Sequence, residues 1–128
     1  MYTISELQTL INESIHHEKI GREPYSLYDP INYTLNAGGK RIRPALVLLA
    51  CNLYSDNIEK ALKPAIGLEI FHNFTLLHDD IMDHADIRRG NPTVHKKWNE
   101  NTAILSGDAM FIKAYEYILE CESPNYRE

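Results

Sequence analysis

The sequence predicts an all-α fold that forms a single unit over residues 1–128, and three observations support this prediction. Apolar residues recur at the three- and four-residue spacing of amphipathic helices through most of the chain. Glycines and prolines interrupt these stretches where helices are expected to begin or end. No stretch has the alternation of a convincing β-strand, and 128 residues suffice for one hydrophobic core but not for two ordinary domains.

Capping signals place the first helices. Thr3 and Glu6 form a capping-box pattern, so an amphipathic helix is expected over residues 3–18. A glycine- and proline-containing break follows it. Asp29 and Pro30 are then expected as the N-cap and first residue of a second, short helix.

The next helices are expected to build most of the core. Pro44 should open an almost wholly apolar helix that runs to about residue 54. Asp56 or Asn57 should cap another helical segment, and Pro64 should begin or kink a long helix that is apolar on nearly all sides.

Two more helices are expected after a loop. The first is a short one over residues 93–98, and a longer one should start at Asn101 or Thr102 and end near residue 121. Gly107 lies inside the longer helix. A helical glycine costs about 1 kcal/mol relative to alanine, so close helix packing is the expected reason for it.

Composition indicates a globular protein with localised positive charge. The formal net charge of −5 argues against nucleic-acid binding. The longest uncharged apolar run, residues 45–51, is too short to span a membrane, so no stable membrane insertion is expected. Cys51 and Cys121 lack the spacing of a metal site or a disulfide framework. Both are expected to be core thiols of a cytoplasmic protein.

Three aspartates are expected at the C-terminal end of the long helix. Asp79 and Asp83 are four residues apart and should point the same way, with Asp80 to one side. Close carboxylates repel each other, and a cation would remove that cost. Mg²⁺ fits, because it takes one or two carboxylates and adds waters and phosphate oxygens. The alternative is a solvated acidic helix end, although the helix dipole disfavours carboxylates there.

Positive charge gathers at Lys40, Arg41 and Arg43 and again at Arg88 and Arg89. The first group follows two glycines and lies at a helix start, as in many phosphate sites. The second lies in a loop after the aspartates, where a guanidinium can bind phosphate bidentately. A metal and arginines together suggest a ligand such as a diphosphate. The plain alternatives are a helix C-cap with solvated cations and a surface salt-bridge cluster.

Polar residues also interrupt the long apolar helix, at Glu69, His72 and Asn73. Buried polar groups need partners. Structural hydrogen bonds are the expected role of Glu69 and Asn73, and the alternative is that they line a cavity. His72 lies about two turns before Asp79, so it can face the same space as that carboxylate.

Together these stretches resemble the N-terminal portion of the trans-isoprenyl diphosphate synthases, the polyprenyl synthetase family. The aspartate motif alone would be a weak signal, whereas the combination is specific. The matching pieces occur in the family's order and at about its spacing, at residues 38–44, 69–72, 77–83, 88–95 and 107–108. The resemblance implies an isoprenoid synthase-type helical bundle, of which this chain would be the N-terminal half only.

The resemblance implies a homodimeric, Mg²⁺-dependent prenyltransferase. Such an enzyme condenses isopentenyl diphosphate with an allylic diphosphate to a short trans-polyprenyl diphosphate of farnesyl to geranylgeranyl length. By similarity, Asp79 and Asp83 hold Mg²⁺ with Asp80 in support, and Arg88 grips the allylic diphosphate. Asp79, Asp83 and Arg88 are thus the expected catalytic residues. The expected ligands of isopentenyl diphosphate are Lys40, Arg43, His72 and Arg89. Arg41 matches a variable position of the family's motif and is left out of the site.

The chain departs from the family in length. Family members are more than twice as long and carry a second aspartate-rich motif, and nothing after Asp108 resembles it. The expected explanation is an N-terminal fragment of a longer polyprenyl synthetase domain, inactive by itself. The alternative is a naturally short paralogue.

Two other functions compete with prenyl transfer. His78-Asp79, with further His and Asp nearby, suggests an HD-type metal phosphohydrolase, but this function explains neither cationic cluster. A non-catalytic subunit or interaction module of a prenyl synthase would explain the short length. It would not explain why the charged motifs are intact.

Residues before Asp79 on the long helix are expected to set product length. At about 1.5 Å per residue, Phe74 lies roughly 7–8 Å and Phe71 roughly 12 Å from Asp79 along the helix axis. Thr75 lies most nearly beneath Asp79 by helical phase. Phe74 resembles the bulky residue that closes the far end, or floor, of the product cavity in family members that make farnesyl or geranylgeranyl products. The alternative is that Phe74 only packs in the core.

Overall fold

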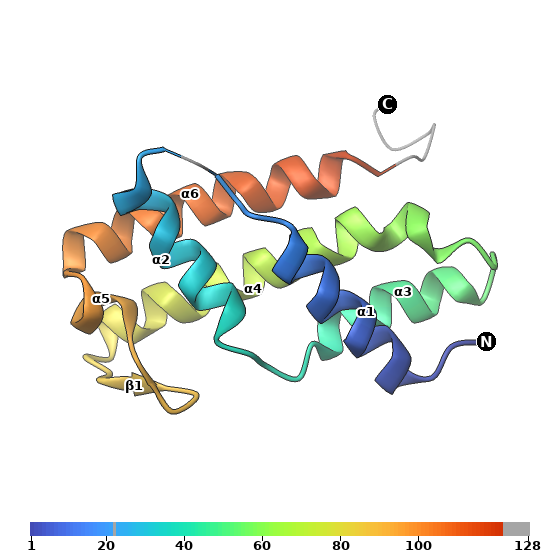
Figure 1. Cartoon of the computed structure of the whole chain (residues 1–128), viewed down its shortest axis with the longest axis horizontal. Coiled ribbons are helices and arrows are strands. Elements are labelled where there is room, and N and C mark those ends of the chain that lie inside the picture. Colours follow the sequence, from blue (N-terminus) through green and yellow to red (C-terminus); the bar gives the residue numbers. More distant parts are fainter. Residues whose placement is uncertain (22, 122–128) are drawn as a thin grey trace.

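The computed structural model describes residues 1–21 and 23–121, and these residues form an assembly of packed helices (Figure 1). The capping box predicted at Thr3 and Glu6 is present, with both hydrogen bonds formed. The elements, in chain order, are α1 (Ile4–His17), α2 (Tyr25–Asn36), α3 (Ile42–Asn52), the 3-10 turn η1 (Ile58–Ala61), α4 (Leu62–Met82), β1 (Ile87–Arg88), β2 (Asn91–Pro92), α5 (Val94–Lys97) and α6 (Glu100–Leu119).

The long helices α4 and α6 run antiparallel and pack along most of their lengths (Figure 1). Two glycines permit this close approach. A Cβ atom added to Gly67 of α4 would lie 2.9 Å from the backbone oxygen of Ala114. A Cβ added to Gly107 of α6 would lie 2.2 Å from the ring of His78. The expectation that Gly107 serves close helix packing is therefore confirmed.

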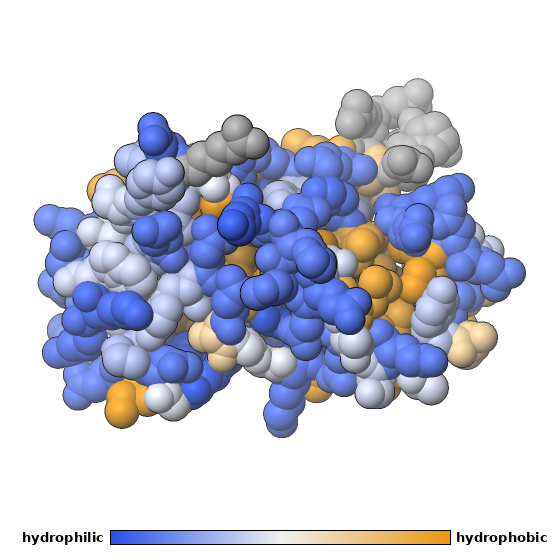
Figure 2. Space-filling model, in the orientation of Figure 1, coloured by the Kyte–Doolittle hydropathy of each residue, from blue (hydrophilic) through white to orange (hydrophobic). Residues whose placement is uncertain are grey.

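The hydrophobic core lies between α4 and the helices around it. Its fully buried large side chains come from α1, α2, α3, α4 and α6, and they include Leu7, Ile11, Ile31, Leu35, Leu48, Ile66, Ile70 and Met110. The face seen in Figure 2 is mostly hydrophilic, with smaller apolar areas exposed between the blue residues. Apolar side chains of α6 also reach the surface, among them Leu105 and Ile112, each 59% exposed.

Helix α2 begins earlier than predicted. It starts at Tyr25, so Asp29 is not its N-cap and Pro30 lies inside it. A proline inside a helix removes one backbone hydrogen bond. The extra turn is held from outside, because the buried hydroxyl of Ser106 on α6 donates to the backbone oxygen of Leu27 at 2.8 Å. A local sequence pattern cannot predict a contact between residues that lie 79 positions apart in the chain.

Other boundaries shift by smaller amounts. Helix α3 starts at Ile42 rather than Pro44, and Pro44 occupies its first turn, where a missing N–H costs little. Helix α6 is capped by Asn99, whose side chain accepts from the backbone N–H of Thr102 at 2.8 Å, and not by Asn101 or Thr102.

The described residues also contain a feature that the sequence did not predict, the two-residue strands β1 and β2. They pair antiparallel around a tight turn at Arg89 and Gly90, both with positive φ. The expectation of two core thiols is wrong, because Cys51 and Cys121 are free and only half-buried. Across the described ranges, none of the helices has the length and apolar character needed to cross a membrane.

We expect Gly67→Ala to destabilise the fold more than Gly107→Ala. At Gly67 the new methyl group meets backbone atoms of α6 that cannot move, and overpacking of this kind costs roughly 1–3 kcal/mol. At Gly107 it meets the end of the His78 side chain, which can rotate away. Urea unfolding followed by circular dichroism measures both free energies. Equal losses would contradict this account of the α4–α6 contact.

Candidate functional site

The three aspartates at the end of α4 lie in different environments. Asp79 and Asp83 are exposed to solvent, whereas Asp80 is only 6% exposed. Both carboxylate oxygens of Asp80 accept from Arg88, from Nε at 2.7 Å and from Nη2 at 2.8 Å. The charge of Asp80 is therefore already paired within the protein, while the two exposed carboxylates stay available to a ligand.

This donor set fits Mg²⁺ better than a metal caged by protein alone. Within residues 1–21 and 23–121, no three His, Cys, Asp or Glu side chains come close enough to hold an ion by themselves. Asp79, in the last turn of α4, and Asp83, its C-cap, offer two exposed carboxylates at the helix end. Mg²⁺ commonly takes one or two carboxylates and completes its shell with waters and substrate phosphates.

Arg88 is placed beside the aspartates by the β1–β2 hairpin. The hairpin is tied to α2, because the hydroxyl of Tyr33 donates to the backbone oxygen of Pro92 at 2.7 Å. The hydrogen bond to Asp80 raises the pKa of Arg88, and the nearby charges of Asp80, Asp79 and Asp83 raise it further. The guanidinium thus remains charged, with one edge on Asp80 and its side chain 37% exposed.

A second cationic group lines a hollow of about 420 Å³ between α3, α4 and the hairpin. Lys40 and Arg43 are both exposed at its edge. Its lining residues are Ala37, Gly39, Lys40, Arg41, Ile42, Arg43, Glu69, His72 and Arg89. The structure therefore brings together all four residues that were predicted to bind isopentenyl diphosphate.

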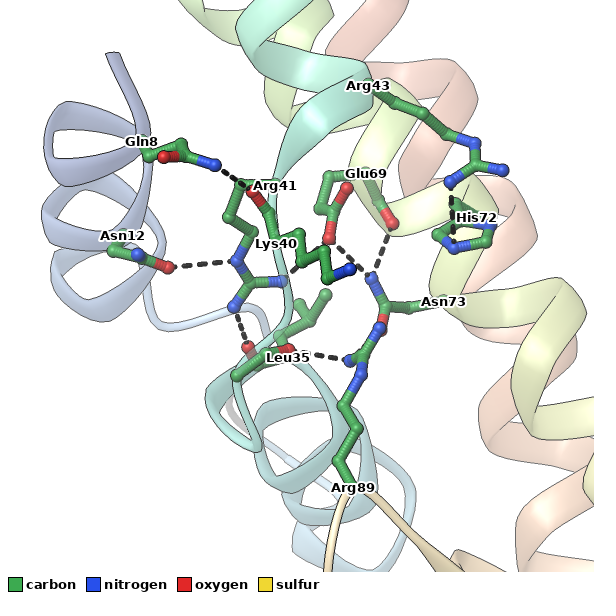
Figure 3. Close-up of polar contacts among 11 residues, drawn as sticks. Gln8, Asn12, Leu35, Lys40, Arg41, Arg43, Glu69, His72, Asn73 and Arg89 are labelled. Atoms are coloured by element: carbon green, nitrogen blue, oxygen red, sulfur yellow. Dashed lines mark hydrogen bonds and ion pairs between the residues drawn. The ribbon is translucent and has the colours of Figure 1, made fainter. Parts of the chain in front are cut away.

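His72 lies next to Arg43 in this hollow, with Nε2 3.2 Å from Nη1 of Arg43 (Figure 3). Burial lowers the pKa of His72, and the neighbouring positive charge of Arg43 lowers it further. A neutral imidazole can accept the hydrogen bond from Arg43 and so hold that guanidinium in place.

Arg41 does not face the ligand side of the hollow. It adopts a left-handed backbone conformation, with φ 51°, and its side chain is buried. Nε donates to Asn12 at 2.9 Å, Nη1 to Glu69 at 2.8 Å and Nη2 to the backbone oxygen of Leu35 at 2.5 Å (Figure 3). This arrangement agrees with leaving Arg41 out of the site, and the structural hydrogen bonds expected of Glu69 are present.

Sequence reasoning missed one residue that contacts a site residue. Asn73 is fully buried, and its Oδ1 accepts from Nη1 of Arg89 at 3.2 Å. A polar residue on an apolar helix was the available signal, and it indicated a hydrogen bond. It did not indicate that the partner would be an arginine 16 residues away in a loop.

Phe74 belongs to an aromatic cluster between α4 and α6. Its ring centroid lies 5.4 Å from that of Phe71, 5.2 Å from Phe111 and 5.1 Å from His78. Phe111, on α6, was not predicted to be near the site. Thr75 is half-buried, and its hydroxyl donates to the backbone oxygen of His72 at 2.6 Å.

The sequence of this chain matches one family of known proteins. Residues 24–128 match the family model described as polyprenyl synthetase. The geranylgeranyl diphosphate synthase of Methanosarcina mazei is 48% identical over 104 residues, which are 81% of this chain and 32% of the relative. The short chain isoprenyl diphosphate synthase of Methanocaldococcus jannaschii is 50% identical over 92 residues, 72% of this chain and 28% of the relative.

Solved structures agree with these matches. A crystal structure of a geranylgeranyl pyrophosphate synthase superimposes with a TM-score of 0.87 at 52% identity, covering 91% of this chain and 36% of that protein. The Geoglobus acetivorans geranylgeranyl pyrophosphate synthetase gives 0.89 at 41% identity, covering 94% and 40%. The chain spans about a third of the length of the curated relatives that it matches. By fold and by sequence, the chain belongs to the polyprenyl synthetase family.

Proposed function

We propose that this chain forms one wall of the active site of an Mg²⁺-dependent prenyltransferase. The reaction joins isopentenyl diphosphate to an allylic diphosphate and yields a short trans-polyprenyl diphosphate. The observation that carries this proposal is that cations gather at two separate places. Arg88 lies near the exposed carboxylates of Asp79 and Asp83, whereas Lys40, Arg43 and Arg89 line the hollow of about 420 Å³. The names of the relatives, geranylgeranyl and geranylfarnesyl diphosphate synthases, support products in this length range.

The allylic diphosphate is assigned to the end of α4. Asp79 and Asp83 would hold Mg²⁺ there, with Asp80 in support through Arg88. When bound, the metal would supply Lewis-acid stabilisation of the negative charge that develops on the departing diphosphate. Arg88 orients the same diphosphate, and its bidentate pairing with Asp80 fixes the direction of the guanidinium.

Isopentenyl diphosphate is assigned to the hollow lined by Lys40, Arg43, His72 and Arg89. The carboxylate in this hollow, Glu69, is 3% exposed and paired with Arg41, so it does not repel an anion at the surface. When neutral, His72 carries no positive charge to attract the diphosphate. Its role is to accept the hydrogen bond that orients the guanidinium of Arg43. No metal is needed to bind the second diphosphate at this place.

The proposal extends to the assembly of the enzyme. Because the matching relatives are about three times as long, we assign the chain as one helical unit that is completed by further helices. Those helices would carry a second aspartate-rich motif on the opposite wall. We also assign the enzyme to the cytoplasm and to a homodimer. The HD-type phosphohydrolase is disfavoured, because His78 Nε2 lies 3.2 Å from the backbone oxygen of Ile104 on α6, and no three His, Cys, Asp or Glu of the described residues could hold a metal together.

We expect the 128-residue chain alone to show no prenyl transfer, because one wall of the site and its metal ligands would be missing. It should also self-associate through exposed apolar faces such as that of α6. Purified chain, free of contaminating synthase, is assayed with both diphosphates, and its size is measured by light scattering. Steady prenyl transfer by the purified 128-residue chain would contradict this proposal.

The metal assignment is tested in a completed synthase, meaning residues 1–128 joined to the remaining helices of a full-length relative. Asp79→Asn or Asp83→Asn should lower kcat by about 100-fold or more, because contacts to the transition state are lost. Asp86→Asn is the matched control, since Asp86 is exposed and pairs only with Lys96 among the described residues. Near-normal rates in the first two variants would show that the metal binds elsewhere.

The same enzyme tests the assignment of the second diphosphate. Lys40→Ala or Arg43→Ala should mainly raise the KM for isopentenyl diphosphate, because these cations contact the substrate before and during the reaction alike. The KM for the allylic substrate should stay close to that of the wild type. A large fall in kcat with an unchanged KM would contradict the assignment.

Phe74→Ala in the completed synthase should shift products to longer prenyl chains. Removal of the ring opens volume beneath Asp79 and leaves the charged groups untouched. Tyr115→Ala is the control, because it removes a 51%-exposed ring of α6 that contacts Phe111 at 5.0 Å, and it should leave product length unchanged. Products are separated by chain length after dephosphorylation. If folded, active Phe74→Ala gives normal products, the floor lies at Phe71 or Thr75.

A further inference from the structure

Beneath the hollow assigned to isopentenyl diphosphate lie two polar side chains that a substrate would not reach. Glu69 and Asn73 stand one turn apart on α4 and are 3% and 0% exposed. Neither belongs to the groups proposed to touch a diphosphate. Their hydrogen bonds nevertheless lead from the core to Arg89, which does belong to them (Figure 3).

Glu69 fixes the orientation of the Asn73 amide. Nδ2 of Asn73 donates to the backbone oxygen of Glu69 at 2.8 Å and to its Oε1 at 3.2 Å. The same Oε1 accepts from Nη1 of Arg41 at 2.8 Å, so Glu69 is itself immobilised by a buried ion pair. With both donors of the amide used, its oxygen must point the other way, towards the hollow.

That oxygen receives Arg89. Nη1 of Arg89 donates to Oδ1 of Asn73 at 3.2 Å and to the backbone oxygen of Gly38 at 2.6 Å. The guanidinium also lies flat against Gly39, where an added Cβ would come within 3.1 Å of Cζ. Both hydrogen bonds come from one nitrogen. Nε and Nη2 of Arg89 thus have no hydrogen-bond acceptor among the described residues and are left for an anion.

Charge alone would not keep Arg89 in this position. Burial lowers the pKa of Arg89, and the positive charge of Arg41 lowers it further, so both effects disfavour the charged side chain here. Glu69 opposes them. Because Arg89 is also exposed overall, its long side chain is free to extend into water unless hydrogen bonds hold it. Asn73 and Gly38 supply those bonds.

We propose that Asn73 is a positioning residue for the second substrate. It holds the guanidinium of Arg89 against the Gly38-Gly39 backbone, and it is itself held by Glu69, the carboxylate partner of Arg41. The affinity for isopentenyl diphosphate thus depends on a buried amide that does not touch the substrate. This inference rests on the proposed function, because it takes Arg89 to be a diphosphate ligand.

The completed synthase is titrated with isopentenyl diphosphate and with inorganic pyrophosphate, and Kd is measured by isothermal titration calorimetry. Asn73→Leu, which keeps the number and branching of the side-chain heavy atoms, should weaken binding of isopentenyl diphosphate about tenfold, the size typical of one charge-assisted hydrogen bond. Asn32→Leu is the matched control. Asn32 also joins two backbone segments, through Ile20 and Tyr28, but contacts no cation among the described residues, so its Kd should stay unchanged.

A double-mutant cycle separates positioning from general loss of structure. In an Arg89→Ala background, Asn73→Leu should cause no further loss of affinity, because the group through which it acts is gone. Equal losses in both backgrounds, or wild-type binding by folded Asn73→Leu, would overturn the inference while leaving the proposed function standing. If the completed synthase with wild-type residues 1–128 bound neither diphosphate, the proposed function itself would fail.

A second variant covers the case in which Asn73→Leu does not fold. Asn73→Ala removes the same amide but leaves a smaller side chain, which the fully buried position accommodates without a clash. Its loss of affinity should likewise vanish in the Arg89→Ala background. A full additional loss there would show that the position of Arg89 is not what this amide controls.

Discussion

The buried ion pair between Arg41 and Glu69 is the interaction on which the arrangement of this chain depends. The two side chains are 2% and 3% exposed, and Arg41 also bonds to α1 and to the end of α2. Loss of one partner from such a pair typically costs about 3–5 kcal/mol, because the other charge stays buried. The left-handed backbone of Arg41 costs roughly 1–2 kcal/mol, which these bonds offset. Three helices, α1, α2 and α4, therefore meet at the guanidinium of the residue that caps α3.

The ion pair between Arg41 and Glu69 explains how neighbouring cations in the sequence can have two roles, one structural and one at the surface. The left-handed turn sends Arg41 inward, while Lys40 and Arg43 on either side remain exposed. The second ion pair, between Asp80 and Arg88, lies nearer the surface, and its arginine is 37% exposed. One pair thus fixes the scaffold, whereas the other holds an arginine that can still reach a ligand. Both pairs remove a carboxylate from the anion-binding surface.

The contact between α4 and α6 places the residue proposed to limit product length. Gly67 and Gly107 bring the helices close together, and Phe111 of α6 thereby packs against Phe74. The ring of Phe74 is supported from behind by a neighbouring helix. If Phe74 is the floor of the product cavity, as proposed, that floor is stiff, because close-packed interiors adjust little. The proposal thus links product length to the packing of these two helices.

The sequence by itself determined the all-α class, the capping box at Thr3 and the position of the aspartates at a helix end, since these follow from local spacing and chemistry. It also marked the two cationic clusters and the glycine of close packing. Only the tertiary structure decided which members of each cluster turn inward, as Arg41 and Asp80 do, and which face solvent. It likewise decided the contact of Arg89 with Asn73 and the extra turn before Pro30. Those outcomes depend on partners 8 to 79 residues away, and no local period of the sequence encodes them.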